Sequence, residues 1–219
     1  MTPVRIALLT ALLTLAPLCG RATAGNASSG DGSGPRAVVQ ATTGAVVSVL
    51  ANKSLSADQK RHQIEDIVYA RVDFETLSHL VLARNWSQLS EAQQKQFMEE
   101  FRQNLSAAYG RNVESYKNEK VQIIDDHAEA RGDWTVRTKI VRNGSNDINV
   151  DYRLRQTDAT WKIIDIIIEN VSLVANFRSQ FQEIMSNGGP TRLLQVLHEK
   201  NEKGEPLPAP AAAGGPGKP

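Results

Sequence analysis

The stretch WKIIDIIIENVSLVANFRSQF, residues 161–181, joins a predicted strand to a predicted helix and decides what the rest of the fold must provide. Over residues 161–168 apolar side chains occupy both faces of the strand, which predicts a central strand that is covered on its two sides. From Ser172 the apolar residues follow helical spacing, and this helix is expected to end at Asn187, before two glycines. A last helix is predicted over residues 190–201. The stretch therefore predicts a sheet that packs against helices.

Upstream of this stretch, the sequence changes from helical to strand periodicity near Lys120. Residues 148–154 alternate apolar and polar side chains, and the turn signal Asn143-Gly144 separates them from a predicted strand over residues 135–141. Four helices are expected earlier: one over residues 39–50, one that Ser56 caps, a short one over residues 74–81, and a longer one that Ser90 opens.

This order of elements predicts an α+β fold, with amphipathic helices packed on one face of a curved antiparallel sheet of about four strands. Such a sheet can enclose an apolar cavity, and it can equally enclose a filled core. Periodicity does not distinguish the two, because a side chain that faces a cavity and one that faces a core are both apolar.

The first 24 residues have the pattern of a secretory signal peptide. One positive charge precedes a largely apolar run of 14 residues, and Ala22-Thr23-Ala24 is a small-residue cleavage site. The run is shorter than the roughly 20 residues that span a bilayer, so we expect cleavage after Ala24. A lipoprotein signal at Cys19 is the alternative, which the bulky Leu18 disfavours. Residues 25–35 are expected to form a flexible linker, residues 36–201 the folded domain, and residues 202–219 a disordered Pro/Gly/Ala tail.

The composition is that of an ordinary globular domain, since 41% of the 219 residues are hydrophobic and the formal net charge is +1. This charge gives no sign of the positively charged surface that nucleic-acid binding requires, so we expect no nucleic-acid partner. Cys19 is the only cysteine and lies in the predicted signal. Disulfides, thiolate catalysis and zinc–thiolate sites are therefore not expected in the mature domain.

The residues that most often bind metals or carry catalysis form no recognised motif. His62, His79, His127 and His198 lie in different predicted elements and lack the i, i+4 spacing of a helical metal site. The run Asp125-Asp126-His127 reads as a solvated hairpin end. The chain also lacks a G-x-S-x-G motif, a P-loop and a dinucleotide-binding G-x-G-x-x-G. We therefore expect neither a cofactor nor an enzymatic activity.

Asp165 is the polar residue that most needs an explanation, because it interrupts an otherwise apolar strand. A carboxylate in that setting must find a hydrogen-bonding or cationic partner. We interpret Asp165 as a structural residue, for example as a partner of Arg178. The alternative is a general base inside a cavity, with Tyr109 as its acid/base partner, in a secreted α+β enzyme of cone-shaped fold.

Four segments carry a resemblance to a known family: DFETLSHLVLARNW at 73–86, QFMEEFRQNLSAAYG at 96–110, VSLVANFRSQF at 171–181 and LLQVLHEKN at 193–201. Together they resemble the MlaC family, also called the toluene-tolerance family. The chain departs from the usual pattern at Asn170, where a glycine is usual, and at Phe177, where a tyrosine is usual. Arg84-Asn85 also replaces a Leu-Gly pair.

The resemblance implies a periplasmic lipid-binding component of a bacterial ABC transport system. A member of the family is a soluble monomeric carrier without a cofactor, which shuttles phospholipid between an inner-membrane ABC transporter complex and an outer-membrane lipoprotein complex and so maintains outer-membrane lipid asymmetry. A hopanoid or another apolar molecule in place of phospholipid, and a non-lipid adaptor with a solid core, stay open. The head group, the number of acyl chains and the direction of transport are not implied.

The family encloses acyl chains between helices and sheet and leaves the head group at the mouth. The candidate lining residues are apolar or aromatic and come from all the predicted elements around such a cavity: Phe74, Leu77, Val81, Phe101, Leu105, Tyr109, Val150, Tyr152, Ile164, Ile166, Val171, Val174, Phe177 and Phe181. Some of them are expected to be plain core. Arg84 and Arg178 are candidates for contact with a head-group phosphate.

Overall fold

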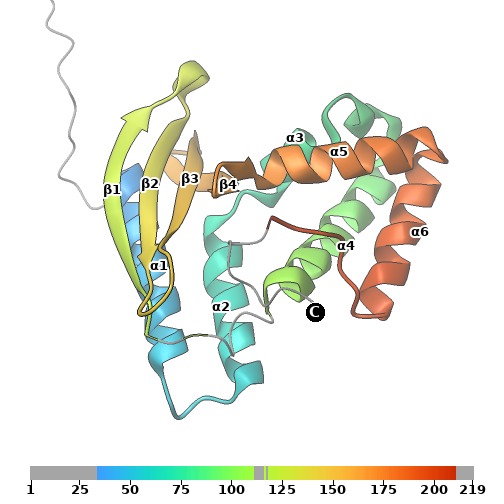
Figure 1. The fold of residues 1–219 in the computed structure, drawn as a ribbon. Helices are drawn as coiled ribbons and strands as arrows, with labels where there is room; N and C mark the ends of the chain where they lie inside the picture. The colour runs from blue at the N-terminus through green and yellow to red at the C-terminus, as the bar shows by residue number, and fades with distance from the viewer. Residues whose placement is uncertain (1–33, 111–115, 117, 211–219) are drawn as a thin grey trace, which may run out of the picture.

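The computed structural model describes residues 34–110, 116 and 118–210 (Figure 1). The predicted signal peptide, nearly all of the predicted linker and residues 211–219 lie outside the described residues. Within the described part, no helix combines the length and the apolar character that a membrane span requires.

The sheet is an antiparallel meander in which each strand pairs with the next one along the chain, in the order β1-β2-β3-β4-β5. Its strands are β1 (Lys120–Ala128), β2 (Trp134–Val141), β3 (Ile148–Thr157), β4 (Thr160–Ile168) and β5 (Val171–Ser172). The predicted α+β class is therefore confirmed, with a fifth strand of only two residues beyond the four that the alternation predicts. The turn before β5 holds Glu169 and Asn170 at positive φ, 47° and 65°. Asn170 thus adopts the left-handed conformation that an asparagine tolerates better than most residues do.

The strand β4 was predicted to be central, but only one of its two edges pairs with a full-length strand. It pairs with β3 along its length, whereas β5 covers only its last residues. Part of its remaining edge is occupied by the junction between two helices: Val72 forms a parallel bridge with Ile163, and the Asp73 amide donates to the Ile163 carbonyl at 2.9 Å. The backbone groups of β4 are thereby partly satisfied by a loop, which anchors the following helix beside the sheet.

The described residues form six α-helices, and the serines that were expected to cap two of them do so. The helices are α1 (Pro35–Ala51), α2 (Ala57–Arg71), α3 (Phe74–Leu82), α4 (Glu91–Gly110), α5 (Leu173–Ser186) and α6 (Gly189–Glu202), with short 3-10 turns at Ala83–Gln88 and Ala130–Gly132. Ser56 forms a capping box with Gln59, and Ser90 exchanges the same two hydrogen bonds with Gln93.

Figure 1 shows two halves, with α1 packed against the sheet on one side and α3 to α6 gathered on the other. Each half has its own apolar core. The core of the helical half is built around Phe97, Phe101, Phe177 and Phe181, all with 0% exposure, whereas Val39, Val136 and Leu154 lie at the centre of the sheet half. Between the two halves runs α2, which contains no buried residue.

The segment after α6 is not the disordered tail that its composition predicts, as far as residue 210. Leu207 is buried in the core of the helical half. The Pro208 carbonyl accepts hydrogen bonds from the side-chain amides of Asn176 and Gln180 at 2.9 and 2.8 Å, and the Pro210 carbonyl accepts one from the Tyr109 hydroxyl at 3.2 Å. The composition of residues 202–210 does not predict this ordered path. A single leucine among prolines is enough to anchor a short segment that has no secondary structure.

Candidate functional site

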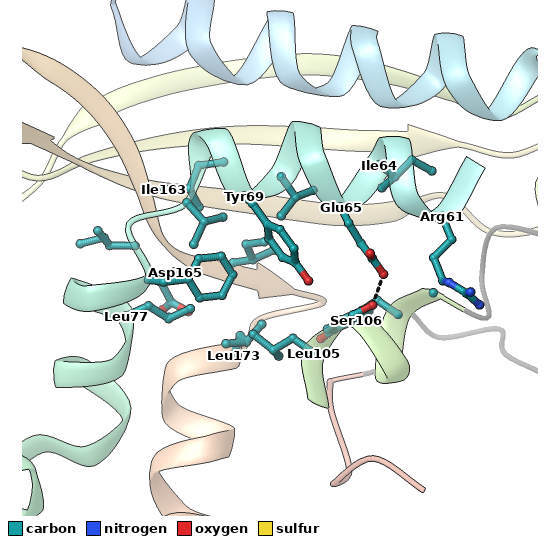
Figure 2. A pocket seen from close by; sticks show the side chains of 17 residues that line it. Arg61, Ile64, Glu65, Tyr69, Leu77, Leu105, Ser106, Ile163, Asp165 and Leu173 are labelled. Atoms are coloured by element: carbon teal, nitrogen blue, oxygen red, sulfur yellow. Dashed lines mark hydrogen bonds between the residues drawn. The ribbon is translucent and has the colours of Figure 1, made fainter. Parts of the chain in front are cut away.

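A cavity of about 210 Å³ lies where α2 faces α3, α4, β4 and the start of α5 (Figure 2). Almost all of its wall is apolar. The residues that line it are Arg61, Ile64, Glu65, Val68, Tyr69, Val72, Phe74, Leu77, Leu105, Ser106, Tyr109, Gly110, Ile163, Ile164, Asp165, Ile166 and Leu173.

The helix α2 supplies one complete wall of the cavity. Its residues Ile64 and Val68, together with the C-cap residue Val72, recur every four positions and so form an apolar stripe along one face. Such a stripe normally packs into a neighbouring element and becomes buried. In this chain it lines the cavity, and for that reason α2 has an apolar face but no buried residue.

The helix is held at its ends and along one turn. At its N-terminal end, the Lys60 ammonium donates to the Leu50 carbonyl of α1 at 2.7 Å. At its C-terminal end, Lys162 of β4 donates to the Ala70 carbonyl at 2.7 Å. Between them, the Ser106 hydroxyl of α4 donates to Glu65 across the cavity. These polar contacts fix α2 without filling the space beneath its apolar stripe.

Asp165 lies at the opposite end of the cavity from Arg61, and its carboxylate binds the beginning of α5. One oxygen accepts a hydrogen bond from the Ser172 hydroxyl at 2.6 Å, and the other accepts one from the Val174 amide at 3.0 Å. Among the described residues, Arg153 forms an ion pair with this carboxylate at 3.9 Å. Asp165 thus joins β4 to the N-terminus of α5, where a negative charge is favourable.

The partner suggested for Asp165 from the sequence, Arg178, is wrong. The Arg178 guanidinium donates two hydrogen bonds to the Leu80 carbonyl at the end of α3, at 2.9 and 2.7 Å. Asp165 binds the start of α5 instead. The first backbone amides of a helix have no intrahelical partner, so they are natural donors to a carboxylate, whereas amides farther along the helix are already used.

We expect Asp165→Asn to lower the free energy of unfolding by about 1–2 kcal/mol, because it removes a buried charge that the α5 N-terminus and Ser172 stabilise. Urea unfolding at neutral pH measures this difference. Asp158→Asn, in the exposed β3–β4 turn, is the matched control and should be neutral. Equal stability of the Asp165 variant and the wild type would remove the structural role.

Tyr109 and Asp165 both line the cavity, as the enzyme alternative requires. However, their polar atoms are engaged by structural partners: the Tyr109 hydroxyl donates to the Pro210 carbonyl, and both Asp165 oxygens accept hydrogen bonds from the β5–α5 junction. Burial also raises the pKa of Tyr109 to about 12, so the phenol stays protonated at neutral pH.

The cluster Asp125, Asp126 and His127 is used in ion pairs and hydrogen bonds around β1. Asp125 pairs with Arg137, and Asp126 accepts hydrogen bonds from Arg36 and from the indole of Trp134. In the part of the chain that the structure describes, no three His, Cys, Asp or Glu side chains are grouped to hold a metal ion.

Comparison with known proteins assigns this arrangement to a family. The model of the MlaC protein family matches residues 40–199, which span α1 to α6. The chain belongs to the MlaC family. It is 26% identical over 160 residues to the toluene tolerance protein ttg2D of Pseudomonas putida, an alignment that covers 71% of this chain and 74% of that protein.

A solved structure in the same fold carries a lipid. It is the phospholipid-binding protein from Ralstonia solanacearum in complex with a phospholipid, 27% identical to this chain, with a TM-score of 0.70. The similarity covers 77% of this chain and 97% of that one. The fold around the cavity of this MlaC-family chain is therefore that of a protein that binds phospholipid.

The structure divides the lining candidates that were chosen from the sequence. It places Phe74, Leu77, Leu105, Tyr109, Ile164 and Ile166 in the cavity wall. The remaining apolar candidates of the helical half, Val81, Phe101, Val174, Phe177 and Phe181, belong to its filled core. Val150 is buried on β3, and Tyr152 packs against the core of the sheet half, while Val171 is 49% exposed.

Neither arginine that was chosen for the head group is part of the cavity wall. Arg84 and Arg178 are both exposed and lie on the 3-10 turn after α3 and on α5. The charged lining residues that sequence reasoning missed are Arg61 and Glu65 of α2. Their spacing to Ile64 and Val68 was a usable signal, because residues beside an apolar stripe share its face.

Proposed function

We propose that this chain is a soluble lipid carrier of the periplasm that holds the acyl part of a phospholipid in the cavity beneath α2. The observation that carries the proposal is the apolar stripe of α2, which lines a cavity where a purely structural helix would be packed. The phospholipid complex of a protein with the same fold supports phospholipid as the ligand.

Binding of this kind needs little chemistry from the protein. Each methylene group moved from water to an apolar wall contributes about 0.8 kcal/mol, so a long acyl chain gains ample affinity without a specific polar contact. The wall fits this requirement because Ile64, Val68, Leu105 and Ile166 present only hydrocarbon to the cavity.

The volume of the cavity indicates how the carrier takes up its ligand. About 210 Å³ lies below the roughly 300–1,000 Å³ of common ligand pockets, and a lipid with two acyl chains needs more room. The wall that yields at the lowest cost is α2, because it buries no residue. Its side-chain hydrogen bond to α4 is the one between Glu65 and Ser106. We therefore infer that α2 moves away from α4 as the lipid enters.

The route of the lipid follows from family membership and from the predicted signal peptide. We infer export to the periplasm, exchange of phospholipid with an inner-membrane ABC transporter complex and an outer-membrane lipoprotein complex, and a contribution to outer-membrane lipid asymmetry. The support for these steps is the match to the MlaC family and the relative named for toluene tolerance.

Native mass spectrometry of the protein recovered from the cell envelope tests the proposal. We expect a chain that begins at Gly25 and carries a noncovalent adduct of phospholipid mass, which denaturing solvent removes. An adduct of hopanoid mass would replace phospholipid as the ligand. A homogeneous protein without any adduct, which also fails to take up phospholipid from vesicles, would contradict the carrier function.

A further inference from the structure

The charges in the cavity wall are distributed unevenly. Among the described lining residues, Arg61, Glu65 and Asp165 are charged. Asp165 lies at the far end and is used by the start of α5. Arg61 and Glu65 are four residues apart on α2, at the end formed by Ser106 and Gly110 of α4 (Figure 2). They therefore lie one above the other, about one helical turn apart, with Arg61 farther out.

Among the described residues, the Arg61 guanidinium has one ion-pair partner and keeps donors for a further ligand. Its ion pair with Asp58, at 2.9 Å, joins side chains that are 43% and 76% exposed. Such a pair contributes little and uses only part of the five N–H donors of a guanidinium. A neighbouring glycine makes room for the arginine, because a Cβ at position 110 would lie 3.1 Å from the Arg61 Cδ. The stem of Arg61 thus lies against the C-terminal end of α4, at the more exposed end of the cavity, since its side chain is 43% exposed and that of Asp165 is 3% exposed.

One turn farther in, the cavity wall carries a carboxylate. The Glu65 side chain is only 22% exposed and accepts a hydrogen bond from Ser106. Burial and, second in size, the Glu65 carboxylate raise the pKa of Tyr69, which also lines the cavity, against the opposing effect of Arg102, whose guanidinium lies 4.9 Å from the centre of the Tyr69 ring. The C-terminal end of α4, where Ser106 and Gly110 lie, adds the partial negative charge of a helix C-terminus.

We propose that Arg61 and Glu65 set the depth at which the lipid sits, with Arg61 binding the head-group phosphate at the entrance and Glu65 preventing the phosphate from passing further in. This assignment rests on the proposed carrier function and adds to it the residue that recognises the phosphate. The acyl chains pass Glu65 without electrostatic cost because they are uncharged. The cavity consequently prefers a lipid with a phosphate over a neutral lipid with the same chains.

The test uses two lipids that differ only in the head group, dioleoyl phosphatidylglycerol and dioleoylglycerol. The full mature chain is incubated with vesicles that contain both in equal amounts, and native mass spectrometry gives the ratio of the two bound lipids. We expect the wild type to favour the phospholipid about tenfold, as one charge-assisted contact predicts, and Arg61→Gln to bring the ratio near one. Arg61→Lys should keep most of the preference, and the preference should weaken at high salt.

Two further variants make the result specific. Glu65→Gln should raise the phospholipid ratio, opposite to Arg61→Gln, because it removes the repulsion. Arg84→Gln, an exposed arginine away from the cavity, should behave as the wild type does. A wild-type ratio in Arg61→Gln, or an unchanged or lower ratio in Glu65→Gln, would overturn the depth-setting role while leaving the carrier function in place. Binding of neither lipid to the wild type would instead overturn the carrier function on which this role depends.

Discussion

Val68→Trp is expected to lower phospholipid binding at least tenfold while the melting temperature of the protein changes little. Val68 lies in the middle of α2, lines the cavity and is not buried, so an indole at this position would extend into space that the acyl chains need. Overpacking costs about 1–3 kcal/mol where a core is already filled, and that cost is largely absent beside a cavity. Uptake of a fluorescent phospholipid from vesicles and thermal unfolding of the same samples measure the two effects.

Two matched tryptophan variants define the comparison. Gln63→Trp adds the same side chain to the exposed face of α2 and should leave both binding and stability unchanged. Val81→Trp places it in the core of the helical half, where Val81 is 1% exposed, and should destabilise the protein. If Val68→Trp unfolds as early as Val81→Trp and still takes up phospholipid, then α2 does not border a binding cavity.

The helix α2 shows which features can be predicted from the sequence and which cannot. The spacing of Ile64 and Val68, the capping serine and the length of the helix are local properties, and all of them are visible in the sequence. What the stripe faces depends on how far α2 stands from α4, which is decided by contacts at the two ends of the helix. No local pattern records that distance, so a cavity wall and a core face look the same.

Charged residues were misassigned for a related reason. Arg61 and Glu65 were not among the candidates for the site, because charges next to an apolar stripe usually remain in water. Arg178 was suggested as a partner of Asp165 and as a contact for the head-group phosphate, yet its guanidinium caps α3 through the Leu80 carbonyl. For Asp165, the true partners stood in the same quoted stretch, since Ser172 is also the N-cap residue of α5.

Three phenylalanines that were candidates for the cavity lining are core residues in the structure. Phe101, Phe177 and Phe181 were chosen as lining candidates because they are apolar residues of the predicted elements around a cavity. In the structure they contact one another, with ring centroids 5.0 to 5.7 Å apart, and they have no exposed surface. Through these contacts they pack α4 against α5. The departure at position 177 fits this setting, because a buried phenylalanine, unlike a tyrosine, needs no hydrogen-bonding partner.

Phe177→Ala is therefore expected to destabilise the protein by about 3–5 kcal/mol without changing the amount of phospholipid bound per folded molecule. The removed ring leaves a void in a filled core, since its neighbours Phe101 and Phe181 are packed from every side and cannot close in fully. Urea unfolding gives the loss of stability, and lipid uptake by the folded fraction gives the binding.

The matched variant is Ile64→Ala, which removes apolar atoms from the cavity wall. Because Ile64 is only partly buried and already borders open space, its loss should cost about 1 kcal/mol or less and weaken lipid binding instead. The two variants should thus show opposite profiles, stability lost in one and binding lost in the other. A Phe177→Ala protein that folds as stably as the wild type but no longer binds lipid would place this ring in the binding site and would extend the cavity into what the structure shows as core.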